Sequence, residues 1–305
     1  MDVSRFGLRQ RPFPATPDTA CYYPATAHEE ALDRLLHGLT EGEGVLVLAG
    51  ETGTGKTLLC HRLLERLGGD IRSAFLTNSH VPDRAALLQT ILYDLRLPFQ
   101  GKSEQEMRLS LTDYLLEGFA DGKSTVLIVD EAHHLAPDLL EELRLLGNLE
   151  ARSGKALQVV LVGQPSLLTT LQTPELEPLR QRVVVRQELS GLNLDEAADY
   201  LLHHVRVAGG KPEAVLLDEA VEVLARQTRG VPRLLNQAAH LAMCLAEEAD
   251  VRQVDAEAAL EALARLGLEF VGESEEEESR RDDSADDGED DRFTGQVIVP
   301  SRRPG

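Results

Sequence analysis

Eight residues decide the fold of this chain: Gly50-Glu51-Thr52-Gly53-Thr54-Gly55-Lys56-Thr57. They match the pattern G-x-x-x-x-G-K-[ST] and lie between an apolar run, Val45 to Leu48, and a segment of helical periodicity that begins at Leu58. Glycines in such a loop let backbone N–H groups and the following helix N-terminus point at a phosphate. The pattern predicts a P-loop in which Lys56 reaches the β and γ oxygens and Thr57 offers a hydroxyl to Mg²⁺.

A second motif is the acidic end of an apolar run. Residues 126–129 are continuously apolar and are followed by Asp130 and Glu131. Such a run predicts a buried parallel strand with the two acids at its carboxyl end, although a solvated acidic turn is an equal alternative for this segment alone. Together with the P-loop it predicts a Walker B element, with Asp130 holding Mg²⁺ through water and Glu131 polarising the attacking water. ATP and Mg²⁺ are therefore the expected ligands.

The composition excludes several classes of protein. The chain has 305 residues, 42% of them hydrophobic, and a net charge of −21. No run approaches the roughly 18 apolar residues of a membrane span, and the N-terminus lacks the apolar region of a signal peptide, so we expect a cytoplasmic protein without a membrane span. The spacing of the three cysteines does not suit a metal, and we expect them to be reduced: Cys21, Cys60 and Cys244.

The negative charge is concentrated near the end of the sequence. Residues 273–291 contain 12 acidic residues and two arginines. A segment of this kind cannot bury enough apolar surface to offset its ordering entropy, so we expect a disordered tail. The remainder of the chain is also acidic, which argues against a broad nucleic-acid surface on electrostatic grounds and leaves a local arginine patch as the alternative.

Short apolar strands alternate with helical segments in the first two thirds of the chain. Besides the two strands above, strands are predicted at 74–77, 158–162 and 183–187, and helices at 28–39, 84–95, 104–119 and from Pro137 onward. This alternation predicts an α/β fold, with a parallel sheet that has helices on both faces. The nucleotide is expected beyond the carboxyl ends of the strands.

From Asp195 onward only helical periodicity remains, at 195–207, 218–228, 233–249 and 255–266. We therefore expect four parts. Residues 1–40 form an N-terminal segment and helix that contribute to the nucleotide site, and 41–190 form the α/β nucleotide-binding domain. Residues 191–268 form a small all-helical lid domain, and 269–305 form the disordered acidic tail.

These motifs together resemble the AAA+ ATPases. The resemblance rests on the P-loop and Walker B element, on a polar residue after the fourth strand, on an arginine pair at 179–182 (LRQR), and on 230–233 (GVPR). More narrowly, residues 142–150 (ELRLLGNLE) followed by 162–165 (VGQP) are similar to the ATPase domain of general secretion pathway protein A. The resemblance runs from about Phe6 to Leu266. It implies an ATP-hydrolysing oligomeric switch or motor in secretion or cell-envelope assembly.

The resemblance also implies roles for individual residues. Gln164 corresponds to sensor 1, beside the γ-phosphate, and Arg233 to the sensor 2 arginine of the lid. Arg182, or failing that Arg180, corresponds to the arginine finger that a neighbouring subunit supplies, which implies a homo-oligomer. Tyr22 is placed near the adenine, with a packing role as the alternative. The expected nucleotide-binding residues are Gly50, Glu51, Thr52, Gly53, Thr54, Gly55, Lys56, Thr57, Asp130 and Tyr22, with Thr57 and Asp130 at the metal.

Three functional hypotheses follow. The first is the secretion or envelope ATPase, with a protein partner in that system; the proteins that it resembles continue into a membrane helix and a wall-binding region, whereas here an acidic tail follows, so we expect a separate membrane partner. The second is a DNA-handling AAA+ regulator of the transposition or replication-initiation type. The third is a scaffold that binds ATP without turnover, which an intact Glu131 disfavours.

Two pairs of adjacent histidines are not expected to bind a metal. His133-His134 and His203-His204 are adjacent, and neighbouring side chains on a helix point about 100° apart, whereas ligand pairs prefer a spacing of four. We therefore expect no metal site besides Mg²⁺. Asp130-Glu131-Ala132-His133 spells a helicase motif, but helicases of that kind need two tandem units and this chain has one P-loop.

Overall fold

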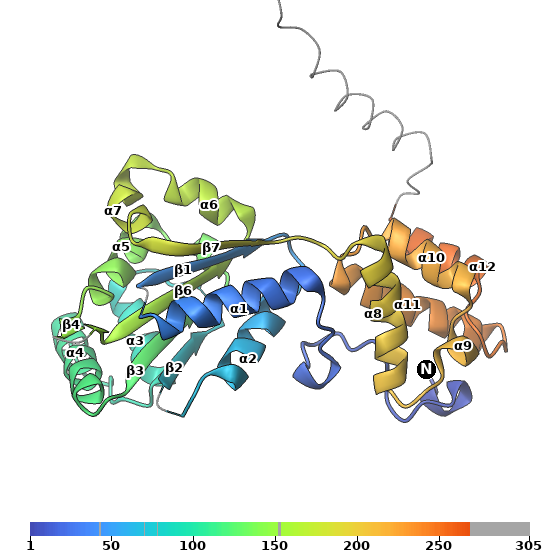
Figure 1. The fold of residues 1–305 in the computed structure, drawn as a ribbon, viewed down its shortest axis with the longest axis horizontal. Helices are drawn as coiled ribbons and strands as arrows, with labels where there is room; N and C mark the ends of the chain where they lie inside the picture. The colour runs from blue at the N-terminus through green and yellow to red at the C-terminus, as the bar shows by residue number, and fades with distance from the viewer. Residues whose placement is uncertain (43, 70, 78, 152–153, 269–305) are drawn as a thin grey trace, which may run out of the picture. The chain divides into compact units, whose positions relative to one another are not determined.

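The computed structural model describes residues 1–268, except 43, 70, 78 and 152–153 (Figure 1). Residues Met1–Leu268 form one compact unit. The predicted acidic tail at 269–305 lies outside the described residues. Within the described part, no helix combines the length and the apolar character needed to cross a membrane.

A five-stranded parallel sheet forms the first layer of the fold, as the sequence predicts. Its spatial order is β2-β3-β6-β1-β7. The three central strands are buried almost throughout, which explains their continuous apolar sequences. The five strands are β1 (Val45–Gly50), β2 (Ile71–Leu76), β3 (Ser124–Val129), β6 (Leu157–Gly163) and β7 (Val183–Leu189).

The edge strands differ from the central ones. β7 alternates between half-buried and exposed residues, and β2 begins three residues before the apolar run at 74–77 that predicted it. Its first residues, Ile71 to Ser73, are not fully buried, and the Arg72 guanidinium lies 4.6 Å from the centre of the Tyr114 ring. An edge strand needs no continuous apolar pattern, so hydrophobicity alone placed its start too late.

Helices cover both faces of the sheet. In β1, Leu46 and Leu48 pack toward α1 and α2, whereas Val45 and Val47 belong to the cluster on the other face, because side chains alternate along a strand. One face carries α1 (Thr26–Thr40) and α2 (Lys56–Arg66), and the other carries α3 (Arg84–Asp94), α4 (Glu104–Ala120), α5 (Pro137–Leu146) and α6 (Pro165–Leu171). The short helix α7 (Glu177–Arg180) and the hairpin β4 (Glu150–Ala151) with β5 (Gly154–Lys155) were not predicted from the sequence.

A helical bundle follows the sheet. It consists of α8 (Leu194–Val207), α9 (Pro212–Val215), α10 (Asp218–Gln227), α11 (Pro232–Glu248) and α12 (Ala256–Arg265). We call this bundle the lid. A parallel bridge, Leu216 with Val254, joins the segments before α10 and α12.

The N-terminal segment contacts both parts of the molecule. Phe6, Leu8 and Phe13 are buried in the hydrophobic core of the lid. His204 Nδ1 in α8 donates to the carbonyl oxygen of Pro12 at 2.8 Å. The chain then continues into α1, which packs on the sheet. We call residues 1–25 the strap, because they connect the lid core to the sheet.

Candidate nucleotide-binding site

The P-loop joins β1 to α2, and two of its glycines have left-handed backbone angles. Gly53 has φ 88° and Gly55 has φ 99°. A Cβ atom on Gly53 would lie 2.8 Å from Cβ of Arg233, and one on Gly55 would lie 3.1 Å from Nε2 of His28. Both positions therefore need glycine for the backbone angle and for close approach by a neighbour.

Lys56 is the buried cation of this loop, with 5% of its surface exposed. Its Nζ donates to the carbonyl oxygens of Gly50 at 2.7 Å and Glu51 at 2.8 Å. Burial lowers the pKa of Lys56, and the nearby carboxylates of Glu131 and Asp130 oppose that shift. The loop thus holds an ammonium group among its own backbone carbonyls, and contact of this group with a phosphate stays a prediction.

A direct hydrogen bond joins the two predicted phosphate-site motifs. Thr57 Oγ1 donates to Asp130 Oδ2 at 2.7 Å, and the backbone N–H of Glu131 donates to Asp130 Oδ1 at 2.9 Å. A hydroxyl and a carboxylate side by side are the oxygen donors that Mg²⁺ prefers. The residues present therefore fit this ion, and its binding by Thr57 and Asp130 stays a prediction.

Ser79 holds the turn after the Walker B strand. Its side-chain hydroxyl donates to the carbonyl oxygen of Asp130, and Ser79 is buried. The backbone N–H of Asp130 donates to the carbonyl oxygen of Leu76 at 2.9 Å. Ser79 was not predicted from the sequence, where the available signal was a polar residue two positions beyond the expected end of a strand.

Glu131 has a left-handed backbone with φ 53°, and its carboxylate lies next to His133. The distance from Glu131 Oε2 to His133 Nδ1 is 3.5 Å, and the backbone N–H of Gln164 approaches the same nitrogen at 3.3 Å. Burial lowers the pKa of His133, and so does the neighbouring His134. These contacts bring the Glu131 carboxylate and the Gln164 backbone to the same nitrogen of one imidazole ring.

Gln164 follows β6, which lies between the P-loop strand and the Walker B strand. In the parallel register, Gly163 is level with Ala49 of β1, and Leu161 is level with Val129 of β3. Gln164 is therefore at the level where the P-loop begins and three residues beyond the last pairing with β3. This is the place that its predicted sensor 1 role requires, and the role itself stays a prediction.

Arg233 brings the lid into contact with the P-loop. It is the second residue of α11, and its backbone N–H donates to the carbonyl oxygen of Gly53 at 3.2 Å. A second backbone hydrogen bond joins the segment before α8 to the segment before α11. In it, the Leu192 N–H donates to the Gly230 carbonyl oxygen at 2.9 Å. Gly230 has φ 65°, and a Cβ there would lie 1.8 Å from the Leu192 carbonyl oxygen.

Arg182 does not lie at the same site. It precedes Val183, which pairs with Val45 at the amino-terminal end of β1, whereas the P-loop begins at Gly50 at the other end. Five residues of strand separate these levels by about 17 Å. Arg180 is exposed and forms an ion pair with Glu177. Neither arginine is brought to the P-loop of its own chain.

His28 is a site residue that the sequence analysis missed. It lies near the start of α1, is buried, and its Nε2 donates to the carbonyl oxygen of Thr54 at 2.8 Å. Burial lowers the pKa of His28, which favours the neutral form of the ring. Its Nδ1 is buried and has no hydrogen-bond partner among the described residues. A lone histidine at a helix start carries no sequence signal for such a contact.

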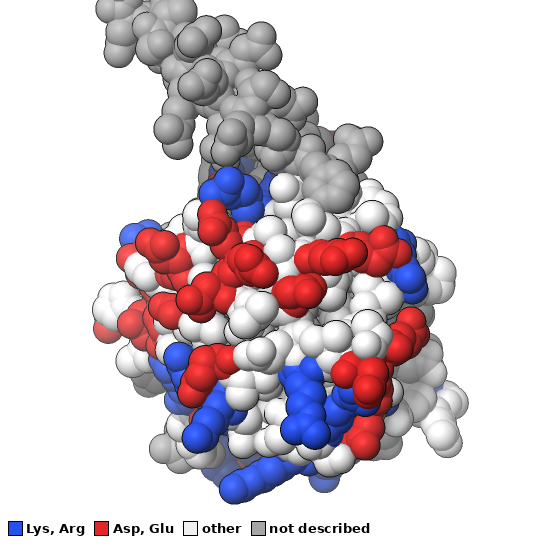
Figure 2. Space-filling view, turned by 90° about the vertical axis from the view of Figure 1, so that its right-hand side faces the viewer, with Lys and Arg blue, Asp and Glu red and all other residues white. Residues whose placement is uncertain are grey.

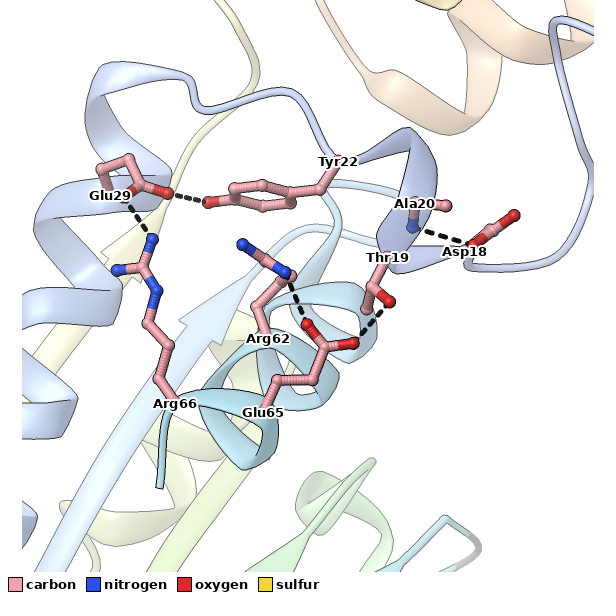
Figure 3. Close-up of polar contacts among 8 residues, drawn as sticks. All are labelled: Asp18, Thr19, Ala20, Tyr22, Glu29, Arg62, Glu65 and Arg66. Atoms are coloured by element: carbon pink, nitrogen blue, oxygen red, sulfur yellow. Dashed lines mark hydrogen bonds and ion pairs between the residues drawn. The ribbon is translucent and has the colours of Figure 1, made fainter. Parts of the chain in front are cut away.

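Tyr22 anchors the strap on α1 and α2 (Figure 3). Its hydroxyl donates to Glu29 Oε1 at 2.7 Å, and the Arg62 guanidinium lies 5.0 Å from the ring centre. Arg66 donates to the other oxygen of Glu29 at 2.9 Å. Burial raises the pKa of Tyr22, with Glu29 adding to the shift. Contact with adenine stays a prediction for this residue.

A hollow of about 460 Å³ lies where the strap meets α2. Strap residues line one part of it and α2 residues the other: Pro17, Asp18, Thr19, His61, Leu64 and Glu65. None of these lining residues belongs to the P-loop or the Walker B element, so we do not assign the hollow to the phosphates. The cysteines are free, as predicted, with Cys21 and Cys60 buried and Cys244 partly exposed.

Comparison with known proteins supports the same reading of the chain. Residues 39–171 match the family model described as an AAA domain. General secretion pathway protein A of Aeromonas hydrophila is 39% identical over 232 residues, which cover 76% of this chain and 42% of that protein. The RuvB subunit of the Holliday junction branch migration complex of Wolinella succinogenes is 25% identical over 244 residues, covering 76% of this chain and 62% of that protein.

A solved structure shows the same fold. The crystal structure of Cdc6p from Pyrobaculum aerophilum aligns with a TM-score of 0.69 and 20% identity, covering 90% of this chain and 73% of that one. The chain spans less than two thirds of the length of the curated relatives above. Residues 39–171 thus match an AAA domain, and the chain is similar over 76% of its length to general secretion pathway protein A.

Proposed function

We propose that this protein hydrolyses ATP with Mg²⁺ and works as an oligomeric switch or motor. The observation that carries the proposal is the 2.7 Å hydrogen bond from Thr57 to Asp130, which joins the P-loop to the acidic strand end. This hydrogen bond places the predicted phosphate-binding loop beside a carboxylate that can bind a metal, so one ligand can contact both. A nucleotide triphosphate with its divalent cation is such a ligand.

Each residue of the site then has a distinct task. Lys56 and the backbone N–H groups of 50–57 bind the phosphates, and Thr57 and Asp130 hold Mg²⁺, which neutralises phosphate charge when bound. Glu131 orients and polarises the attacking water. Gln164 contacts the γ-phosphate or this water, and Arg233 reaches the phosphates from the lid. We propose 41–190 as the catalytic domain and 191–268 as the lid that responds to the nucleotide.

Arg182 supports an oligomer in this proposal. It lies at the far end of β7 from the P-loop of its own chain, so it can stabilise a transition state only in a neighbouring subunit. Each active site would then lie between two protomers. This arrangement makes hydrolysis depend on assembly, which is how a switch or motor couples nucleotide state to a partner.

The cellular role follows from similarity alone. General secretion pathway protein A is the relative with 39% identity, and we propose a role in secretion or cell-envelope assembly with a protein partner of that system. This chain covers 42% of that relative, so we propose a partner for this chain and do not take over the partner of the relative. A cytoplasmic location belongs to the same proposal.

A DNA-handling regulator is the second candidate, and the RuvB relatives favour it. Figure 2 shows the lid side of the molecule, with acidic side chains across its upper half and basic ones toward its lower edge. On α10 and α12, Arg226 and Arg265 are paired with Glu222 and Glu261 at 2.9 and 2.8 Å. Three exposed arginines of the strap and α8 are the phosphate contacts that we propose for this candidate: Arg9, Arg11 and Arg206.

Two measurements on the purified protein test these candidates. The first is Mg²⁺-dependent phosphate release from ATP, with Lys56→Ala as the inactive control. Release by the wild-type protein alone supports hydrolysis, whereas nucleotide binding without release would leave a scaffold. The second is retention on DNA over a salt series. Tight retention that weakens steeply with salt and is lost in an Arg9→Ala/Arg11→Ala/Arg206→Ala variant would favour the DNA-handling candidate over the secretion one.

A further inference from the structure

A cluster of metal-binding side chains lies directly after the Walker B acids. Glu131, His133 and His134 each offer a ligand atom, and these atoms all lie within 4.8 Å of one another. The expectation that adjacent histidines diverge does not hold here, because 132–134 form a single 3₁₀ turn instead of part of an α-helix. The two imidazole centroids are 4.0 Å apart, and the His80 ring centroid is 4.5 Å from that of His134.

The donor atoms distinguish this cluster from the Mg²⁺ site beside it. Thr57 and Asp130 offer oxygen, which hard cations prefer, whereas the cluster offers two imidazoles and one carboxylate. Two histidines and one glutamate are a typical protein donor set for zinc, with water completing the coordination. The two neighbouring sites are therefore suited to different ions.

The surroundings hold the cluster in place and leave it accessible. The Gln164 N–H contact at 3.3 Å keeps the His133 ring beside Glu131, whose Oε2 is 3.5 Å from Nδ1. The His133 side chain is 8% exposed and that of Glu131 is 42% exposed, while His134 is exposed. A cation can thus enter from solvent on the His134 side, and at His133 Nδ1 it would replace the Gln164 N–H, which donates to that nitrogen at 3.3 Å.

We propose that Glu131, His133 and His134 form a second cation site for a borderline divalent ion such as Zn²⁺, and that occupation of this site stops ATP hydrolysis. The ion would hold the Glu131 carboxylate as a ligand, so this carboxylate could not polarise the attacking water. ATP would stay bound, since the P-loop and Thr57 are not among the ligands. The inhibitory part rests on the proposed hydrolysis, whereas the binding part does not.

The first experiment measures Zn²⁺ binding without nucleotide. Metal-free protein is titrated with Zn²⁺ by calorimetry or against a chromophoric chelator. We expect one site per chain, and we expect His134→Asn to weaken the affinity by roughly tenfold or more. Two variants serve as matched controls. His37→Asn removes an exposed histidine from α1, and Cys244→Ser removes the thiol that lies 3.8 Å from His240 Nε2.

Both controls should bind Zn²⁺ as the wild-type protein does, and thermal unfolding should show that His134→Asn is folded. Wild-type protein that takes up no Zn²⁺ in molar excess, or His134→Asn protein that binds it as tightly, would overturn the site. So would loss of binding in Cys244→Ser. These outcomes do not depend on whether the protein hydrolyses ATP.

The second experiment measures phosphate release in Mg²⁺ and ATP with added Zn²⁺, together with retention of a fluorescent nucleotide. We expect Zn²⁺ to inhibit the wild-type protein while nucleotide stays bound, and His134→Asn to resist inhibition. Equal inhibition of both proteins would reject the regulatory claim, because Zn²⁺ would then act elsewhere, for example on ATP itself. A wild-type protein without phosphate release in the absence of Zn²⁺ would refute the proposed function and leave the binding result intact.

Discussion

The backbone N–H of Arg233 donates to the carbonyl oxygen of Gly53 at 3.2 Å, so a hydrogen bond between backbone atoms joins the lid to the P-loop. The close approach is possible because Gly53 lacks a Cβ, which would lie 2.8 Å from Cβ of Arg233. Movement of α11 must therefore carry this part of the loop along or break the hydrogen bond. Lid position and loop conformation are coupled at this point.

Glu131→Gln should bind ATP with nearly wild-type affinity and should not hydrolyse it. The amide keeps the size of the side chain but cannot polarise the water, whereas the phosphate contacts of Lys56 are unchanged. Equilibrium binding of a fluorescent nucleotide and phosphate release would separate the two effects. Hydrolysis at the wild-type rate would show that the assignment of Glu131 is wrong.

Arg182→Ala should leave ATP affinity nearly unchanged and reduce turnover by up to about 10³-fold, because a finger acts on the transition state. Mixing this variant with Glu131→Gln should restore part of the activity. In the mixed oligomer, some interfaces combine an intact Glu131 from one subunit with an intact Arg182 from its neighbour. Arg180→Ala is the matched control, because Arg180 is already paired with Glu177. If Arg180→Ala loses turnover instead, the finger is Arg180; no recovery on mixing would argue for a monomeric enzyme.

Gly230→Ala should destabilise the lid strongly. The added Cβ would lie 1.8 Å from the Leu192 carbonyl oxygen, in a backbone with φ 65°. Gly7→Ala is the control, because Gly7 has a similar φ of 69° and nothing within 4 Å of the new Cβ. We expect about 1 kcal/mol of destabilisation for Gly7→Ala and roughly 3 kcal/mol or more for Gly230→Ala in denaturant unfolding. Similar losses of unfolding free energy in the two variants would mean that the backbone contact between Gly230 and Leu192 tolerates a side chain.

His28→Leu should weaken ATP binding, because it removes the hydrogen bond to the Thr54 carbonyl inside the P-loop. One such bond is worth about 1 kcal/mol, so we expect Kd to rise by no more than roughly tenfold. His28→Gln offers an amide donor of similar reach and should recover part of the affinity. An unchanged Kd in His28→Leu would restrict this histidine to packing.

His204 should make the free energy of unfolding depend on pH below neutrality. Burial lowers its pKa from 6.5 to about 4. Between these values the unfolded chain binds a proton that the folded chain does not, so stability falls as the pH falls from 6.5 to 4 and is unaffected above 6.5. The loss through this residue is at most ~3 kcal/mol.

His204→Asn isolates this contribution, because Asn can still donate to the carbonyl oxygen of Pro12. Chemical unfolding of both proteins across the pH range measures it, since the carboxylates titrate equally in each and cancel in the difference. A smaller slope is expected in the variant. Equal slopes would assign the pH dependence to other groups.

The local elements of this fold could be predicted because their causes are local. Glycines and Lys56 after an apolar run specify a strand, a loop and a helix, and the acids after residues 126–129 mark the end of a buried strand. Helical periodicity beyond Asp195 likewise predicted the bundle. Elements without a strong pattern, such as the start of β2 and the hairpin of β4 and β5, were missed.

Contacts between distant residues depended on the tertiary structure. His28 meets Thr54 across 26 positions and Ser79 meets Asp130 across 51, and neither pair has a sequence pattern. The third case is Phe13, which lies in the lid core although the chain reaches the lid helices only after the whole sheet. Apolar residues can be predicted to be buried, but the surface against which they pack is chosen by the assembled fold.

By itself, the sequence determined the strand, loop and helix that carry the predicted phosphate site, because glycines, a lysine and a threonine stand there at fixed spacing. Only the tertiary structure decided the strand order, which inserts β6 between β1 and β3 and so brings Gln164 between the P-loop and Glu131. Parallel strands are joined by long crossover connections, so neighbours in space need not be neighbours in sequence. The order of the strands therefore depends on how the helices on both faces of the sheet and the lid pack together.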